Sequence, residues 1–295
     1  MDGQLETNMS FNPAALLSRA PRVTRQTYTT RDTILYALGV GAGIEDATDA
    51  SELRFLYERD LIALPTLAIV IAAPAFWLDD PALSFDWKRV LNAGQELALE
   101  RPMPVEGSVS TELRIDAIWD KGAEKGAVME SSRVLRDGSG TTLATIRQTH
   151  FLRGNGGFGG APQPKAFERL DPASRAPDHV VDLPTRQETA LIYRLSGDHN
   201  PLHVDPQVGR AAGFERPILH GSCTFGVVAR AVLRAAVGND PARLKRFGAR
   251  FSRPVYPGDT IRTEIWCEGG DIHFRALAME RGIVVLDRGY AVARS

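Results

Sequence analysis

The segment "YRLSGDHNPLHVDP", which starts at residue 193, concentrates side chains that can exchange protons or hold water. They are Asp198, His199, Asn200, His203 and Asp205. A helix that ends near residues 196–197 would be followed by a turn, because Pro201 cannot continue a helix and favours extended geometry in the residue before it. An aspartate and a histidine that share one water or one substrate proton are suited to general acid–base catalysis, with Asn200 as a neutral group that positions the water.

Two other interpretations of this loop compete with catalysis. Asp198 and Asn200 are common turn formers, and His203 could cap a strand or helix. A metal site could use His199, His203 and Asp205, although their spacing matches no strong metal-binding signature. The density of proton-handling groups in so short a segment favours acid–base chemistry over a plain turn.

A second feature supports the catalytic interpretation. The segment "RPILHGSCTFG", from residue 216, brings His220 and Gly221 to the start of an apolar helix. Free backbone amides and the positive end of the helix dipole suit a developing oxyanion there, and a glycine lets a substrate approach closely. Ser222 and Cys223 lie near the same helix start, but a nucleophile needs an adjacent base, and a buried thiol usually serves packing. The combination suits addition or elimination next to a carbonyl group.

The elements that must position these groups occur twice along the chain. Thr29 with Asp32, and Thr185 with Glu188, have the spacing of a helix capping box. Each predicted helix runs through Leu and Tyr into glycine, as "ILYALGVGAG" in the first half and "LIYRLSGDHN" in the second. The sequence therefore predicts one structural unit that has been duplicated.

Each half ends in short alternating runs separated by turn sequences such as "DKG", "DGSG", "EGGD" and "ERG", which predict antiparallel hairpins. Before the second set, "HGSCTFGVVARAVLRAAVG" predicts a buried helix that Gly238 stops. We expect an α+β protein that contains two copies of one unit, in which an antiparallel sheet curls around a central helix. The central helix of the first copy is less evident in the sequence than that of the second. The expected parts are a flexible arm (residues 1–20), a first unit (21–153), a Gly- and Pro-rich linker (154–178) and a second unit (179–295).

The overall composition excludes several classes of partner. The 295 residues include 35 basic and 36 acidic ones, which leaves no positive field to hold nucleic acid or an anionic membrane surface. Only Cys223 and Cys267 are present, so we expect two buried thiols in a reducing compartment. The apolar stretch from residue 61 contains Pro65 and Pro74 and has no cationic flank, so we expect core rather than a membrane segment. The final "AVARS" is not a peroxisomal signal of the Ser-Lys-Leu type, which makes the cytoplasm the expected location.

The catalytic segment together with "AGFERPILHGSCTFG" resembles the signature of the MaoC-like, or type 2, enoyl-CoA hydratases. The resemblance extends into the first half through "YTTRDTILYALGVGAG", "LPT", "RPMPVEG", "DKG" and "GGFGG", so it covers nearly the whole chain after the arm. It implies a tandem, or double, hot-dog fold in which only the second unit carries the catalytic loop. The first unit, with "VGAG" in place of "DHNP", would mainly house the acyl chain.

The resemblance also implies a role for each site residue. Asp198 and His203 would be the acid–base pair that handles water and the substrate α proton, and Asn200 would position the water. The amide of Gly221 would bind the thioester oxygen. The implied enzyme is a hydro-lyase that converts trans-2-enoyl-CoA reversibly to (R)-3-hydroxyacyl-CoA by syn hydration, without metal or redox cofactor, in fatty-acid β-oxidation. CoA is part of the substrate.

Two departures from the family pattern affect specificity rather than the catalytic loop. Relatives commonly have His-Gly-Glu-Gln where this chain has "NAGQ" (residues 92–95), and a small residue other than glycine at the position of Gly209. No Gly-rich phosphate loop is present, so isolated basic residues must bind the CoA phosphates. The pairs Arg230 with Arg234 and Arg250 with Arg253 are candidates, although an exposed, solvated role is the common state of arginine.

Other functions remain open at this point. A hot-dog acyl-CoA thioesterase could use the same site with an activated water, a non-catalytic subunit could only bind acyl-CoA, and a dehydratase of fatty-acid or polyketide synthesis would run the reaction in reverse. We expect an acyl-CoA thioester as the partner and no nucleic acid or membrane. A homodimer is a further expectation.

Overall fold

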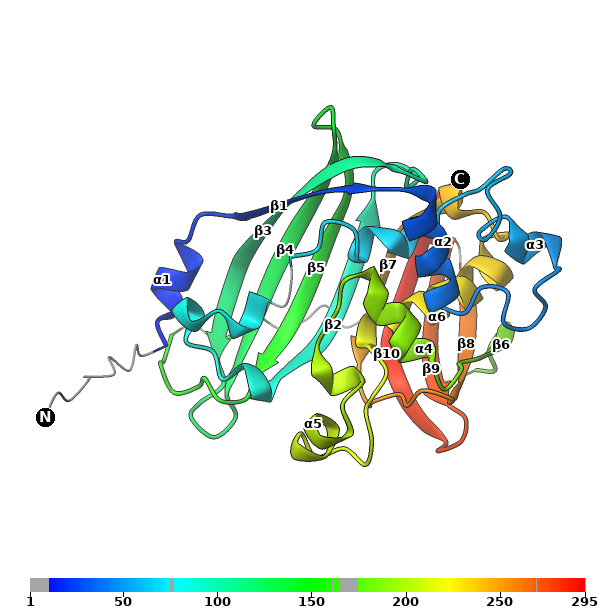
Figure 1. Cartoon of the computed structure of the whole chain (residues 1–295). Helices are drawn as coiled ribbons and strands as arrows, with labels where there is room; N and C mark the ends of the chain where they lie inside the picture. The colour runs from blue at the N-terminus through cyan, green and yellow to red at the C-terminus, as the bar shows by residue number, and fades with distance from the viewer. Residues whose placement is uncertain (1–10, 75–76, 161, 165–174, 269, 295) are drawn as a thin grey trace, which may run out of the picture.

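The computed structural model describes residues 11–74, 77–160, 162–164, 175–268 and 270–294. Its strands form one ten-stranded sheet in the order β1-β3-β4-β5-β2-β7-β10-β9-β8-β6. The two halves of this order mirror each other, so the first five strands along the chain and the last five repeat one arrangement. The predicted α+β duplication is confirmed (Figure 1).

The strands of the first half are β1 (Arg22–Tyr28), β2 (Val90–Leu99), β3 (Gly107–Asp120), β4 (Ala127–Asp137) and β5 (Thr142–Leu152). Those of the second half are β6 (His179–Pro184), β7 (Leu244–Phe251), β8 (Thr260–Glu268), β9 (Asp271–Ala278) and β10 (Ile283–Ala293). All neighbouring strands of the sheet pair antiparallel. Strand β2 pairs with β7 from Gly94 opposite Arg250 to Ala98 opposite Arg246, and this joint fuses the two half-sheets.

The predicted central helix is α6 (Gly221–Ala236), whose middle is buried. Gly226 lets it approach the first half, since a Cβ atom there would lie 2.6 Å from a methyl carbon of Val40. Gly238 follows the helix with a φ of +67°, a conformation that favours glycine and explains why the helix stops. Figure 1 shows α2, α4, α5 and α6 on one side of the sheet, which we call the helix-covered face.

The two predicted capping boxes have different outcomes. In the first half, α2 (Thr30–Gly39) begins after Thr29, whose amide and hydroxyl both donate to Asp32 Oδ2, at 2.8 and 2.9 Å. In the second half the prediction is wrong, because α4 (Thr189–Tyr193) begins four residues after Thr185. The hydroxyl of Thr185 instead donates to the carbonyl of Asp259, which ties the end of β6 to the start of β8.

The described part of the first half has no counterpart of α6 between α2 and β2. Its helical segments there are all short: α3 (Ala50–Leu53) and four 3₁₀ helices, η1 (Pro65–Ile69), η2 (Trp77–Asp79), η3 (Pro81–Leu83) and η4 (Trp87–Arg89). The residues from Ala63 to Ala72 are buried against the sheet and α6, so the predicted core role of this stretch is confirmed for them. Within the described residues, no helix is both long and apolar enough to span a bilayer.

Two smaller predictions need correction. Residues 1–10 of the expected arm lie outside the described residues, but α1 (Pro13–Leu17) is a helix capped by Asn12, and Leu16 is buried against the sheet. Cys223 is buried as expected, whereas Cys267 is exposed, because it lies at the end of β8 where the alternation of buried positions stops. The bounds of the linker stay a prediction, since residues 165–174 lie outside the described residues.

Candidate active site

The catalytic loop is built from short, well-capped pieces. Helix α4 continues into a 3₁₀ turn (Arg194–Ser196), and Gly197 ends it with a φ of +120°. Asn200 Oδ1 accepts from the amide of Leu202 and so caps the next turn, η7 (Pro201–His203). Asp205 caps α5 (Pro206–Ala211) through a 2.7 Å bond from the amide of Gln207. Asp198 Oδ1 also accepts from the amide of Asn200 at 3.2 Å. The turn-forming interpretation is therefore right for Asp198 and Asn200, and both have a structural role in addition to any catalytic one.

The fold brings together the side chains of Asp198, His203 and His220. One side-chain oxygen or ring nitrogen from each residue lies within 4.8 Å of the corresponding atoms of the other two. His199 is exposed and Asp205 is occupied as a cap, so the trio His199, His203 and Asp205 considered as a metal site is not assembled. Of the loop groups considered at the outset, the side chains of Asp198 and His203 converge. His220 joins them from the start of α6.

The tautomer of His203 follows from its partner. Its Nδ1 lies 2.8 Å from the carbonyl oxygen of Ile218, which can only accept, so Nδ1 carries the hydrogen and Nε2 is left to exchange a proton. Burial lowers the pKa of His203, while Asp198 and the Ile218 carbonyl oppose the shift. The imidazole is thus neutral near pH 7 and able to act as a base.

His220 forms one wall of the site. Its ring stacks on that of His203 with centroids 3.8 Å apart, and its Nε2 lies 3.2 Å from the backbone carbonyl of Asp198. Burial, together with His203, lowers the pKa of His220 to about 2. His220 therefore stays neutral, positions the backbone of Asp198 and orients His203. The sequence placed it beside Gly221 but gave no sign of the stacking.

The start of α6 faces this cluster. The first helical bond at this end runs from the Thr224 amide to the His220 carbonyl, so the amides of residues 221–223 precede it and have no helical acceptor. Gly221 is tightly packed, with a Cβ position 3.1 Å from the ring of Phe251. The proposed oxyanion role of Gly221 agrees with this arrangement and stays a prediction. Cys223 donates to the carbonyl of Gly39, and burial raises the pKa of its thiol far above the ordinary value, which favours packing over nucleophilic attack.

The first half contributes a polar contact that the loop motif did not reveal. Gln95 is buried in β2, and its Oε1 accepts from Ser222 Oγ at 3.1 Å and from Gln148 Nε2 at 3.2 Å. Ser222 follows Gly221 directly, so Gln95 joins the first half-sheet to the proposed oxyanion site. The only sequence signal for it was the glutamine that ends "NAGQ".

The arginines considered for the CoA phosphates are mostly engaged within the protein. Arg230 is buried and bonded to Glu52, so the expectation of an exposed role is wrong for it. Arg234 pairs with Glu45 and Glu52, and Arg250 pairs with Asp287. Arg253 is exposed and donates to the carbonyl of Ser252.

The lowered pKa of His203 predicts the acid limb of the pH profile. A histidine that acts as a base is active when neutral, and a pKa below 6.5 keeps it neutral as the pH falls. We expect kcat/KM to hold its plateau down through pH 6.5 and to fall only below it. In the variant His203→Gln this limb should be lost along with most activity; a wild-type limb centred above pH 7 would contradict the assignment.

Fold and site together define a double hot-dog protein with an acid–base cluster at the start of its central helix. Two family models match it, the "MFE-2 hydratase 2 N-terminal domain" over residues 26–154 and the "MaoC like domain" over residues 170–288. The chain belongs to the MaoC-like, type 2 enoyl-CoA hydratase family.

Relatives match over most of the chain. It is 38% identical to the peroxisomal enoyl-CoA hydratase 2 of Arabidopsis thaliana, over 98% of this chain and 97% of the relative. It is 42% identical to the 3-hydroxyacyl-thioester dehydratase Y of Mycobacterium tuberculosis, over 89% of this chain and 91% of the relative. A crystal structure of a MaoC-like dehydratase from Phytophthora capsici superposes with a TM-score of 0.82 at 33% identity, over 95% of this chain and 98% of that one.

Proposed function

We propose that this chain catalyses the reversible syn hydration of trans-2-enoyl-CoA to (R)-3-hydroxyacyl-CoA. The observation that carries the proposal is the convergence of Asp198 and the Nε2 side of His203 near the start of α6. The names of the relatives, enoyl-CoA hydratase 2 and 3-hydroxyacyl-thioester dehydratase, support the same reaction.

In the proposed reaction, a water is held between Asp198 and His203 Nε2, with the Nδ2 hydrogens of Asn200 as further donors. The water oxygen bonds to C3 as one of its O–H bonds breaks and the pair takes up that proton. The pair then delivers a proton to C2 on the same face, so water is added in full and no group stays on the enzyme. Enolate-like charge on the thioester oxygen is stabilised by the amide of Gly221 and the helix dipole of α6.

The direct test follows the loss of enoyl-thioester absorbance with crotonyl-, octenoyl- and hexadecenoyl-CoA and resolves the configuration of the product. We expect an (R)-3-hydroxyacyl-CoA from at least one chain length. Release of free CoA thiol would indicate the thioesterase instead. Tight binding of all three without turnover would indicate a non-catalytic acyl-CoA-binding subunit.

A metal-free reaction is part of the proposal, although a carboxylate and two imidazoles could ligate an ion. His203 and His220 each use one ring nitrogen toward a backbone carbonyl, and the acid–base role needs the remaining Nε2 of His203 free. We expect enzyme dialysed against a chelator to keep its full rate in the absorbance assay. A loss that added zinc reverses would contradict this part.

The cellular setting is a separate part of the proposal. We propose fatty-acid β-oxidation as the pathway and the cytoplasm as the location, although the Arabidopsis relative is named as peroxisomal. Fractionation of cells that express the tagged chain tests the location. Light scattering during size exclusion tests the proposed homodimer.

A further inference from the structure

The outer end of the first half contains a cavity of about 290 Å³ between α1, the strands β1 and β3, and the short helices η2 and η3. Its wall is largely apolar and is formed by Leu16, Leu83, Leu113 and Ile115, with Trp77 as an aromatic face. The three leucines are at most 6% exposed, so this wall belongs to the core of the first half. A concave, mostly apolar pocket is the usual form of a small-molecule site, and this one lies at the lower end of the usual range of about 300–1,000 Å³. The cavity therefore suits a small ligand.

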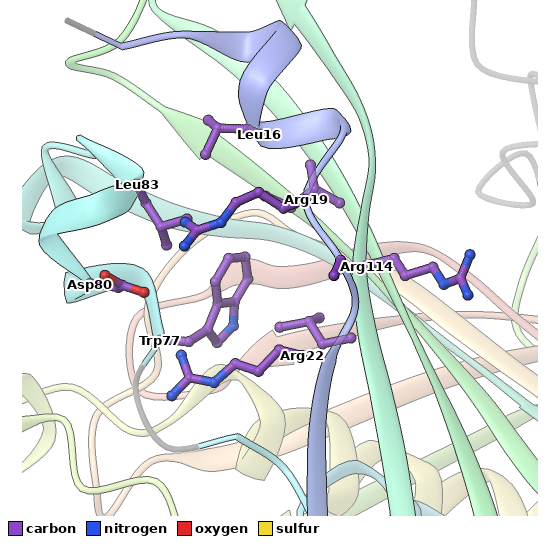
Figure 2. A pocket seen from close by; sticks show the side chains of 10 residues that line it. Leu16, Arg19, Arg22, Trp77, Asp80, Leu83 and Arg114 are labelled. Carbon is purple, nitrogen blue, oxygen red and sulfur yellow. The ribbon is translucent and has the colours of Figure 1, made fainter. Parts of the chain in front are cut away.

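Three arginines line this cavity, and two of them are directed into it. Figure 2 shows the side chains of Arg19 and Arg22 extending to the same side as Trp77 and Asp80, whereas Arg114 extends to the opposite side. Asp80 is the one acidic residue of the described lining, and one of its carboxylate oxygens is occupied in capping η3. Two arginines and one aspartate give the interior a net charge of +1, which is complementary to an anion with a single negative charge.

Neither of the two inward-directed arginines has a carboxylate partner in the part of the chain that the structure describes. Arg19 donates to the carbonyl of Ala82 at 3.5 Å, and the side chain of Arg22 has no hydrogen bond or ion pair with any described residue. On the second half-sheet, by contrast, Arg262 bonds to Asp182 at 2.7 Å. A guanidinium group binds a carboxylate through paired, charge-assisted hydrogen bonds. The two arginines beside an apolar wall therefore form a site for an anion that also has an apolar part.

The cavity is separate from the reaction site. Gln95 of β2 bonds to Ser222 at the start of α6, and three strand spacings, about 14 Å, separate it from Ile115 of the cavity wall. Trp77 packs edge-on against the buried His150, with centroids 6.1 Å apart, so the indole stands between the cavity and the inner part of the first half. This arrangement favours a second molecule that enters from outside over the acyl chain of a substrate bound at α6.

We propose that this cavity binds a free medium-chain fatty acid as its anion. The carboxylate lies between the guanidinium groups of Arg19 and Arg22, and the alkyl chain packs against Trp77, Leu113 and Ile115. The carboxylate supplies the negative charge and the acceptor oxygens that the two arginines lack, and the apolar wall removes the alkyl chain from water. The site goes beyond the proposed hydratase reaction and uses none of its residues.

The test is a calorimetric titration of the whole chain with octanoate, octan-1-ol and octylamine. We expect saturable binding of one octanoate per chain, at least about tenfold tighter than that of octan-1-ol, because hydrogen bonds to charged groups contribute this much or more, and no binding of octylamine. Arg22→Gln should weaken octanoate binding by at least about tenfold and leave the affinity for octan-1-ol unchanged. The control Arg114→Gln removes an arginine that points away from the cavity and should change neither affinity.

A second variant tests the cavity without touching either arginine. Ala20 lines the cavity from an exposed position, so Ala20→Phe should fill the space and abolish octanoate binding with little effect on thermal unfolding. Equal affinities of the wild type for octanoate and octan-1-ol, or octanoate binding that Ala20→Phe leaves unchanged, would overturn the proposal. Competition of octanoate with octenoyl-CoA that persists in Ala20→Phe would place the fatty acid in the acyl site and overturn it as well. The titration needs no turnover, so a lack of hydration would contradict the proposed function alone.

Discussion

The variant Asp198→Asn should have a kcat for the hydration of trans-2-enoyl-CoA that is about 10²–10⁴-fold lower than that of the wild type. This is the range that general acid–base groups contribute. Asparagine has nearly the same shape, and the backbone carbonyl of residue 198 still accepts from His220, so the cluster should keep its geometry. What is lost is the carboxylate that lies beside His203 and, in the proposed reaction, helps to take up the proton of the water. Initial rates with octenoyl-CoA and thermal unfolding of both proteins measure the effect.

A matched control lies seven residues along the same loop. Asp205→Asn also removes one carboxylate, but its side-chain oxygen can still accept from the amide of Gln207 and cap α5. We expect the control to keep its rate within about twofold of the wild-type rate and its free energy of unfolding within about 0.5 kcal/mol of the wild-type value. Aspartate and asparagine are both good N-cap residues, so exchanging one for the other at the surface changes stability little. If Asp198→Asn were as active as Asp205→Asn, the catalytic assignment would be wrong.

The variant Glu52→Ala should lower the free energy of unfolding by about 3–5 kcal/mol, because it leaves the buried Arg230 without its counter-charge. Glu52 lies on α3 and is 6% exposed; it bonds to Arg230 at 2.5 Å and Arg234 at 3.1 Å and accepts from the amide of Gly43. Burial opposes its ionisation, but both arginines and the amide outweigh this and hold the pKa of Glu52 below its ordinary value. The stability that ionised Glu52 adds to the folded protein is therefore present at neutral pH and is lost as the pH falls through that lowered pKa.

Denaturant titration of two further variants separates this pair from general surface effects. Glu45→Ala removes the exposed partner of Arg234 and should cost at most about 1 kcal/mol. The double variant Glu52→Leu with Arg230→Met removes both buried charges and should recover most of the loss. If the double variant were as unstable as Glu52→Ala, an unpaired Arg230 would not be the cause.

Local patterns made several elements in both halves predictable. The alternation of β9, the capping of α2 by Asp32 and the stop of α6 at Gly238 are all set by neighbours in sequence, so they could be read from it. The convergence of Asp198 and His203 was predictable for the same reason, because only four residues lie between them and one of the four is Pro201.

Contacts between distant segments could not be predicted in this way. His220 stacks on His203 because the loop and α6 fold together, and Gln95 meets Ser222 although 127 residues separate them. The capping box at Thr185 failed because the hydroxyl of Thr185 is bonded to Gly258 and Asp259, which lie just before β8. The sequence around Arg230 predicts an ordinary surface arginine on a helix. Its burial depends on Glu52, which lies in the other half of the chain.

The joint between β2 and β7 has a consequence for how this protein can change over evolutionary time. In a dimer of identical hot-dog units, symmetry repeats every substitution on both sides of the molecule. Here the two units lie in one chain, so a mutation affects one of them only. The catalytic loop can therefore stay constant in the second unit while the first unit accumulates substitutions of its own, including those around Gln95 beside Ser222. Duplication followed by fusion separates selection on the reaction from selection on the substrate.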